Sequence, residues 1–190
     1  MNMLKIPVER LREGPLEMDL DAAPEELDLA DPDFEFTGRV GGRVSFSIVL
    51  NDVLARGELR APFLSRCVRC LEPARGEVRA EVMETWMRGE QKPPEEEAGE
   101  DDQIVNRYMG DFIEPAEVFR ELIMAALPDR VYCREDCAGL CPGCGANLNR
   151  EPCRCPPEER RRREEGRMPE WKLKLRGLAK GDAETSTDTD

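Results

Sequence analysis

The chain has 190 residues and a formal net charge of −13, with 36% charged and only 5% aromatic residues, which fits one domain with a modest core, or one domain with a small appended module. Histidine is absent, so histidine-based catalytic triads, histidine general bases and histidine metal ligands are all excluded. No apolar run reaches transmembrane length and the charged N-terminus lacks the apolar stretch of a secretory signal, so we expect a cytoplasmic protein.

The first half of the chain predicts strands separated by turns. Residues 3–11 alternate loosely, as an edge strand does, and the acidic residues 12–33 predict a loop with at most a short helical turn. From residue 34 the apolar period becomes two, and Gly41-Gly42 falls where a two-residue hairpin turn needs positive φ. The strands expected from this pattern cover about 34–40, 44–50, 53–65 and 76–87.

One helix is predicted after the strands, from about Glu114 to Leu127. Pro115 suits its first turn, Pro128 stops it, and its broad apolar face should cover the sheet. Residues 89–103, with two prolines and a run of glutamates, predict an exposed or disordered acidic loop. The fold class that follows is α+β: a small antiparallel β-meander or barrel covered by one helix, in a β-rich domain over 1–128.

The C-terminal residues 158–190 form a charged segment. The run Glu158–Arg167 fits a solvated helical face as well as it fits RNA binding. Apolar residues at Trp171, Leu173, Leu175 and Leu178 offer a small stripe for docking, and the last ten residues are expected to be disordered.

Eight cysteines are the most informative residues of the chain. Cys67 and Cys70 form a Cys-x-x-Cys pair at the expected tip of a hairpin, between the third and fourth strands. The other six lie near the C-terminus, at Cys133, Cys137, Cys141, Cys144, Cys153 and Cys155. A structural zinc ion takes four thiolates in a tetrahedron, so eight cysteines predict two zinc ions. We therefore expect a cysteine-rich zinc module over 129–157, packed on the Cys67/Cys70 hairpin.

Other uses of the cysteines are weaker interpretations. Disulfides need an oxidising compartment, and a redox Cys-x-x-Cys is expected beside a βαβ pattern, which neither pair has. A catalytic zinc keeps an open position for water and usually has histidine or carboxylate ligands. Rubredoxin-like iron stays open as an alternative, because Cys141-Pro-Gly-Cys144-Gly145 is also the turn found there. That alternative would make the chain a redox or electron-transfer protein.

Basic charge accompanies the cysteines. Residues 39–88 hold 9 basic and 6 acidic side chains and residues 129–176 hold 12 and 9, whereas residues 1–38 and 89–128 each hold 3 and 11. A four-thiolate zinc centre is itself anionic and attracts arginines, which is the structural explanation. The functional explanation is a contact surface for phosphate. The arginines concerned are Arg66, Arg69, Arg134, Arg150 and Arg154.

The order of these parts resembles the YceD family, the bacterial and chloroplast large ribosomal RNA subunit accumulation proteins. The resemblance covers about residues 3–178, and its most specific part is the run from Gly139 to Asn149, Gly-Leu-Cys-Pro-Gly-Cys-Gly-Ala-Asn-Leu-Asn. It implies a ribosome-biogenesis factor that supports accumulation of large-subunit (23S) ribosomal RNA by binding, and not an enzyme. Its implied partner is large-subunit ribosomal RNA, or a ribosomal protein or precursor particle, with no membrane and no small-molecule substrate.

The resemblance also bears on how the cysteines group. Some family members lack the second Cys-x-x-Cys yet keep the first, with possible ligands near positions 133 and 137. This implies one site of Cys67, Cys70, Cys133 and Cys137 and a second of Cys141, Cys144, Cys153 and Cys155. The alternative is a zinc ribbon that joins the two Cys-x-x-Cys pairs, Cys67/Cys70 with Cys141/Cys144.

Overall fold

A computed structural model of the chain describes residues 4–89 and 106–159. The chain divides after Cys137 into two compact units, Met1–Cys137 and Ala138–Asp190. The first is mostly β-sheet, and the described part of the second, 138–159, consists of turns with one short helical stretch at its end. The division into 1–128, 129–157 and 158–190 stays a prediction. No helix among the described residues is both long enough and apolar enough to cross a membrane.

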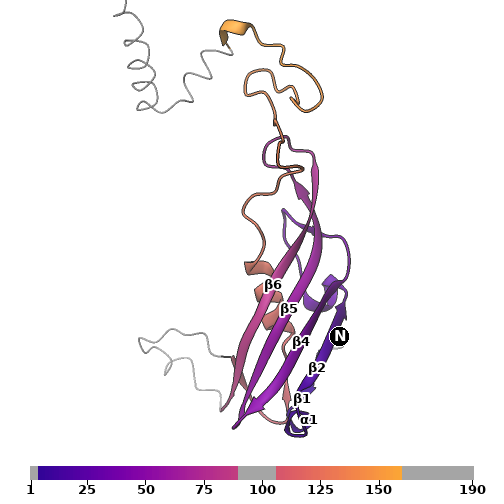
Figure 1. Cartoon of the computed structure of the whole chain (residues 1–190), viewed down its shortest axis with the longest axis vertical. Helices are drawn as coiled ribbons and strands as arrows, with labels where there is room; N and C mark the ends of the chain where they lie inside the picture. Colours follow the sequence, from indigo (N-terminus) through magenta and orange to yellow (C-terminus); the bar gives the residue numbers. More distant parts are fainter. Residues whose placement is uncertain (1–3, 90–105, 160–190) are drawn as a thin grey trace, which may run out of the picture. The chain divides into compact units, whose positions relative to one another are not determined.

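The first unit contains an antiparallel meander with an extra strand at one edge (Figure 1). Its strands are β2 (Leu16–Ala22), β4 (Val40–Val49), β5 (Asp52–Arg66) and β6 (Pro73–Arg88), each antiparallel to the next. β3 (Glu35–Phe36) pairs with β5, and β7 (Asn106–Tyr108) runs parallel to the end of β6. Over the described residues the sheet extends from β2 to β7 without closing, so the alternative of a barrel is not confirmed.

The predicted turn at Gly41-Gly42 is wrong, because β4 runs straight through both glycines. Gly42 lies opposite Leu59 of β5, and a Cβ atom there would collide with the carbonyl oxygen of Glu58 and come within 3.0 Å of Leu59 Cα. The glycine therefore permits a close approach of two strands, and does not supply a positive φ.

The N-terminal predictions also need correction. Residues 3–11 do not form one edge strand: β1 (Ile6–Pro7) is followed at once by the helix α1 (Val8–Arg12), and β1 pairs with β8 (Phe112–Ile113). The expected loop 12–33 contains β2, and then the short 3-10 turn η1 (Pro24–Leu27). In β2, apolar residues alternate with acids, and the density of acids concealed that period of two.

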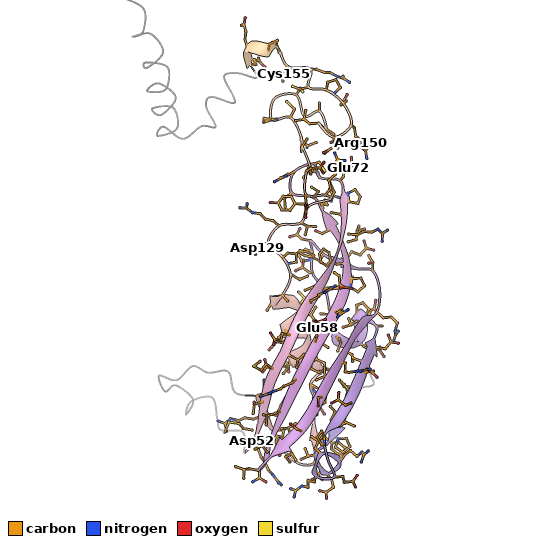
Figure 2. The ribbon with its side chains drawn as sticks, in the orientation of Figure 1. Asp52, Glu58, Glu72, Asp129, Arg150 and Cys155 are labelled. Atoms are coloured by element: carbon orange, nitrogen blue, oxygen red, sulfur yellow. The ribbon has the colours of Figure 1, made fainter. Side chains whose placement is uncertain are left out.

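One helix covers one face of the sheet, as predicted. α2 (Ala116–Ala125) starts after Pro115 and buries Val118, Phe119 and Ile123. The Phe119 ring lies 6.5 Å from that of Phe46 in β4, so the core lies between α2 and the alternate residues of β4, β5 and β6. The opposite face carries exposed, mostly charged side chains, among them Glu58 (Figure 2).

The acidic loop predicted over 89–103 falls almost entirely outside the described residues, and so do residues 160–190 with their apolar stripe. At the edge of the sheet, the N–H of Gly89 donates to the carbonyl oxygen of Tyr108 at 3.4 Å. The points where residues 90–105 leave and rejoin the sheet are therefore neighbours.

Candidate metal centres

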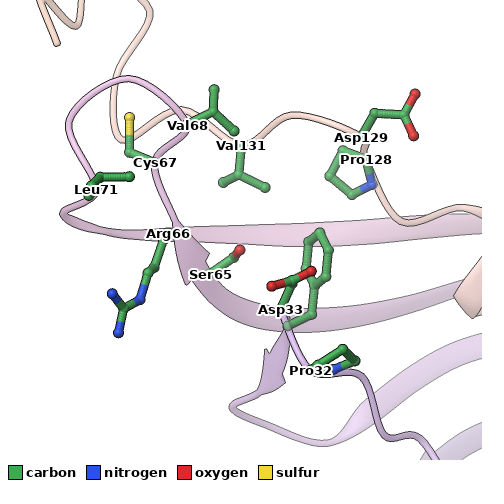
Figure 3. A pocket seen from close by; sticks show the side chains of 11 residues that line it. Pro32, Asp33, Ser65, Arg66, Cys67, Val68, Leu71, Pro128, Asp129 and Val131 are labelled. Atoms are coloured by element: carbon green, nitrogen blue, oxygen red, sulfur yellow. The ribbon is translucent and has the colours of Figure 1, made fainter. Parts of the chain in front are cut away.

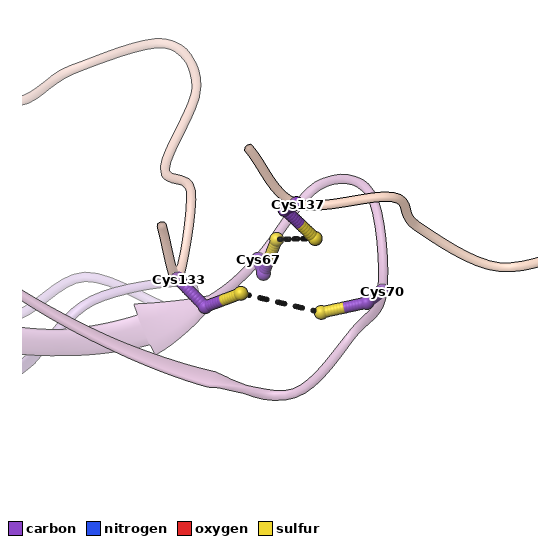
Figure 4. Close-up of side chains that lie close together, drawn as sticks. All are labelled: Cys67, Cys70, Cys133 and Cys137. Carbon is purple, nitrogen blue, oxygen red and sulfur yellow. Dashed lines mark hydrogen bonds between the residues drawn. The ribbon is translucent and has the colours of Figure 1, made fainter. Parts of the chain in front are cut away.

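The first unit brings together four cysteines from two distant parts of the chain. The sulfur atoms of Cys67, Cys70, Cys133 and Cys137, here called the first quartet, all lie within 4.8 Å of one another (Figure 4). The Sγ atoms of Cys67 and Cys137 are 3.8 Å apart, and those of Cys70 and Cys133 are 3.6 Å apart. Four sulfurs at about 2.3 Å from one ion at the corners of a tetrahedron are about 3.8 Å apart, so the quartet has the size of a four-thiolate metal site.

A tight knuckle between β5 and β6 positions the first pair of sulfurs. The N–H of Cys67 donates to the carbonyl oxygen of Glu72, and the N–H of Leu71 donates to that of Cys67, both at 2.9 Å. Leu71 completes the turn with a φ of 61°. The segment after α2 lies against this knuckle, where the N–H of Val68 donates to the carbonyl oxygen of Val131 at 2.9 Å.

Arg69, at the tip of the knuckle, contacts the same segment. Its Nη1 donates to the carbonyl oxygens of Glu135 at 3.2 Å and Cys137 at 3.0 Å. Its guanidinium carbon lies 4.6 Å from the centre of the Tyr132 ring, a distance at which a cation is attracted by the aromatic face. Arg69 is one of the arginines expected to meet RNA, and in the structure it also contacts the segment that carries Cys133 and Cys137.

The second unit holds the other four cysteines. The sulfurs of Cys141, Cys144, Cys153 and Cys155, the second quartet, also lie within 4.8 Å of one another. Cys141, Ala146 and Cys155 are its buried core, with Cys153 packed against them. The single residue between Cys153 and Cys155 is accommodated by a sharp turn, in which the N–H of Cys155 donates to Cys153 Sγ at 3.3 Å.

The second quartet is built on a knuckle with the same backbone pattern as the first. The N–H of Cys141 donates to the carbonyl oxygen of Ala146 at 2.8 Å, and the N–H of Gly145 donates to that of Cys141 at 2.9 Å. Gly145 has a φ of 72° and occupies the place that Leu71 has in the first knuckle. Within the described residues, each Cys-x-x-Cys thus belongs to a different quartet, and the structure does not have the zinc-ribbon grouping.

Two asparagines hold the second knuckle in place, a role that the sequence pattern did not reveal. Asn149 Oδ1 accepts from the N–H of Ala138 at 2.8 Å, and Asn149 Nδ2 donates to Asn147 Oδ1 at 2.9 Å. The N–H of Leu148 donates to the carbonyl oxygen of Gly139 at 2.9 Å. The Asn-Leu-Asn run therefore fastens the loop to the residues that precede Cys141.

The thiols of the metal-free quartets differ in acidity. Burial raises the pKa of Cys67, but backbone N–H groups of Cys133, Cys70 and Arg69 outweigh it and lower this pKa to about 6. Burial, followed by hydrogen bonds with neighbouring thiols, raises the pKa of Cys133 to about 12. Each quartet therefore combines a thiol that ionises easily with one that holds its proton until a cation displaces it.

The second quartet shows the same contrast. Backbone N–H groups of Cys144 and Gly143 lower the pKa of Cys141 to about 6. The hydrogen bond with Cys141 is the main cause that raises the pKa of Cys153 to about 12.

The five arginines expected to meet RNA are all exposed but are differently engaged. Arg134 lies 3.2 Å from Asp136 and Arg154 lies 2.7 Å from Glu151. Arg150 has an exposed side chain in the second unit. Arg66, at the end of β5, has no ion pair within the part of the chain that the structure describes.

A pocket of about 360 Å³ lies beside the first quartet (Figure 3). Its walls combine apolar side chains, such as Val68, Leu71 and Val131, with Arg66 and Asp129. Across residues 4–89 and 106–159 no charged side chain is buried, and besides the cysteines the buried side chains with a polar atom are Trp86 and Tyr108. The Tyr108 hydroxyl donates to the carbonyl oxygen of Asn51 at 2.6 Å, away from the quartets.

Comparison with known proteins identifies relatives. A family model described as "Large ribosomal RNA subunit accumulation protein YceD" matches residues 55–178, which include all eight cysteines. Uncharacterized proteins of Mycobacterium bovis and Mycobacterium tuberculosis are each 35% identical over 104 residues, 55% of this chain and 49% of theirs. An uncharacterized protein of Mycobacterium leprae is 29% identical over 145 residues, 75% of this chain and 60% of its own length.

The chain thus spans about half the length of the first of these relatives. No solved structure matches it. The family model, by contrast, covers well over half of the chain and both candidate metal centres. The chain therefore belongs to the YceD family, whose name implies a role in the accumulation of large-subunit ribosomal RNA.

Proposed function

We propose that this chain is a cytoplasmic ribosome-biogenesis factor that supports accumulation of 23S ribosomal RNA by binding, without catalysing a reaction. The observation that carries the proposal is the family match, because it spans both quartets and the sheet strands that support the first. Binding, and not catalysis, is supported by the all-thiolate quartets, since a catalytic metal needs an open position that four protein ligands do not leave.

Each quartet in this proposal holds one zinc ion with a structural role. Four thiolates with the spacing of a tetrahedral site suit zinc, which stabilises small modules with few apolar residues. Iron in the same ligands would instead support the alternative function, electron transfer in the manner of rubredoxin. Elemental analysis of the purified chain separates the two: the proposal expects two zinc ions per chain and a colourless protein, and a red, iron-containing protein would favour the alternative.

The proposed partner is large-subunit ribosomal RNA, contacted through arginines near the quartets. Arg66 is the best placed of the five, because it is exposed and no described acid competes for it, whereas Arg134 and Arg154 already have carboxylate partners. Arginine contacts with phosphate weaken as salt rises, because binding releases counterions from the RNA. The other four proposed contact residues, with lesser roles, are Arg69, Arg134, Arg150 and Arg154.

The direct test is capture of the tagged full-length chain with identification of both bound RNA and bound protein. We expect enrichment of large-subunit RNA that falls with salt and with Arg66→Glu, relative to the matched change Arg56→Glu. Arg56 is also exposed and lies in the same strand, but it is ten residues before Arg66 and therefore farther from the first quartet. If the captured material changes neither with salt nor with Arg66→Glu, and one ribosomal protein dominates it, the partner is a protein.

A further inference from the structure

The two halves of the first quartet are far apart in the chain and have few direct ties. Cys70 and Cys133 are separated by 63 residues, and α2 already ends at Ala125, so the segment 126–137 has no helix or strand to hold it. Closing such a long loop costs conformational entropy before any metal contact is gained. The ties that bring this segment to the knuckle in the absence of metal therefore decide how well prepared the site is.

Contacts between this segment and the knuckle involve Val68 and Arg69, the two residues between Cys67 and Cys70. One is the backbone hydrogen bond from Val68 to Val131. Arg69 adds three contacts from a single side chain, because it donates to the carbonyl oxygens of Glu135 and Cys137 and lies over the Tyr132 ring. The residues that Arg69 reaches thus flank Cys133 on both sides and include Cys137 itself.

Arginine is suited to this task for two physical reasons. Its planar guanidinium offers several donors in a fixed geometry and can stack on an aromatic ring at the same time, which the point charge of a lysine does not reproduce. It also keeps a positive charge beside a centre that becomes anionic when four thiolates bind a divalent cation.

The second quartet does not require a long-range contact of this kind. Its four cysteines lie within 15 residues of sequence, Cys141 to Cys155, so the loop to be closed is short. The arginine between its last two cysteines, Arg154, pairs with Glu151 three residues away, which is a local contact. A side chain that docks a distant segment therefore matters most at the first quartet.

We propose that Arg69 is a positioning residue of the first metal centre: it docks the segment carrying Cys133 and Cys137 onto the knuckle before metal binds, and so raises the metal affinity. This inference rests on the proposed metal binding. Removing a group that orients metal ligands from outside the coordination sphere typically lowers affinity by about 10- to 100-fold. That range is the expected effect of Arg69→Ala on the first quartet, with the second quartet unchanged.

The experiment is a titration of the metal-free, reduced full-length chain with Co²⁺, followed by competition with a chelator and with Zn²⁺. Four-thiolate Co²⁺ has strong visible absorption, so occupancy is read directly. The variants are Arg69→Ala and Arg69→Lys, with Arg56→Ala, an exposed arginine of β5 away from the knuckle, as the control. We expect two ions per wild-type chain, one ion weakened in Arg69→Ala, partial recovery in Arg69→Lys, and no change in Arg56→Ala.

A second readout separates positioning from a general loss of structure. Hydrogen exchange of the metal-free chain should show faster exchange at 131–137 in Arg69→Ala, with β4, β5 and β6 protected as in wild type. If each of the two ions binds Arg69→Ala as tightly as it binds wild type, the inference is overturned while the metal sites stay in place. A wild-type chain that binds only one ion, or none, would overturn the metal proposal for the first quartet and the role of Arg69 with it.

Discussion

The residue that follows each Cys-x-x-Cys pair differs between the two knuckles: it is leucine in the first and glycine in the second. Leu71 and Gly145 make the same hydrogen bond and both have positive φ, 61° and 72°. For a residue with a Cβ atom this region costs about 1–2 kcal/mol, because Cβ crowds the following carbonyl oxygen. The first knuckle therefore stores backbone strain that the second avoids, and the Leu71 side chain is 57% exposed, so packing offsets little of it.

Replacing Leu71 by glycine should therefore stabilise the first unit. Relief of strain outweighs the extra chain entropy that glycine loses on folding, and we expect a gain of about 0.5–1 kcal/mol in the free energy of unfolding. Denaturant titration of the metal-loaded chain measures it. Leu71→Ala keeps the strain and is the control; an equal gain in that variant would trace the effect to removal of an exposed side chain.

At the scale of elements, the two quartets join different things. The first links the β5–β6 knuckle to the segment after α2, whereas the second supplies Cys141, Cys153 and Cys155 to the apolar cluster found in residues 138–159. Cys67→Ser should remove one of two metal ions and lower the free energy of unfolding of the sheet unit by at least about 2 kcal/mol. Cys141→Ser should also remove one ion but leave the denaturation of β4, β5 and β6 unchanged. Metal content with tryptophan fluorescence of the buried Trp86 follows both changes.

Removal of both metals should divide the molecule along the same boundary. Cys141, Ala146 and Cys155 cannot form a core without a shared ion, so amides over 139–155 should lose protection from hydrogen exchange in a chelator. The strands of the sheet keep their apolar core and should stay protected. Protection of 139–155 that survives complete loss of metal would contradict a metal-dependent second unit.

The acidity of the thiols fixes the direction of the pH dependence. Metal binding displaces thiol protons, including those held at Cys133 and Cys153, so the affinity should rise with pH. The pKa values of Cys67 and Cys141, about 6, are below the unperturbed value of about 8.5. Their thiolates therefore stabilise the fold above that unperturbed value, and this contribution is lost as pH falls through about 6. Chelator competition between pH 5.5 and 8 should show metal released at the acidic end; release at the alkaline end would contradict these assignments.

Some of these elements could be predicted from the sequence because their signal is local. The alternation in β4, β5 and β6, and the prolines that bound α2, identified the sheet and its covering helix. β2 was missed because its acids made an alternating segment look like a loop, and Gly42 was misread because a turn and a close strand approach both favour glycine. Arg69 could not be assigned, since its partners are carbonyl oxygens more than 60 residues away, which no local pattern encodes.

At the scale of the whole molecule, charge is the property most relevant to RNA. The chain carries −13 overall, so unspecific attraction to RNA is weak and the basic groups beside the quartets must act locally. Binding of large-subunit RNA should therefore fall only moderately between about 50 and 200 mM salt, because the salt slope is proportional to the number of phosphates contacted, which is small here. A filter-binding series with wild type and Arg66→Glu measures this, and the variant should show a shallower salt slope by about one unit.

The neighbouring positions of Gly89 and Tyr108 have a practical consequence. Since the sheet already joins these two points, residues 90–105 can be exchanged for a folded reporter whose own termini are close, without stretching β6 or β7. The splice would lie at the far end of β6 from the knuckle, leaving every cysteine and Arg69 untouched. Such a chimera would carry an internal purification handle for capturing bound partners, with both chain ends left as they are.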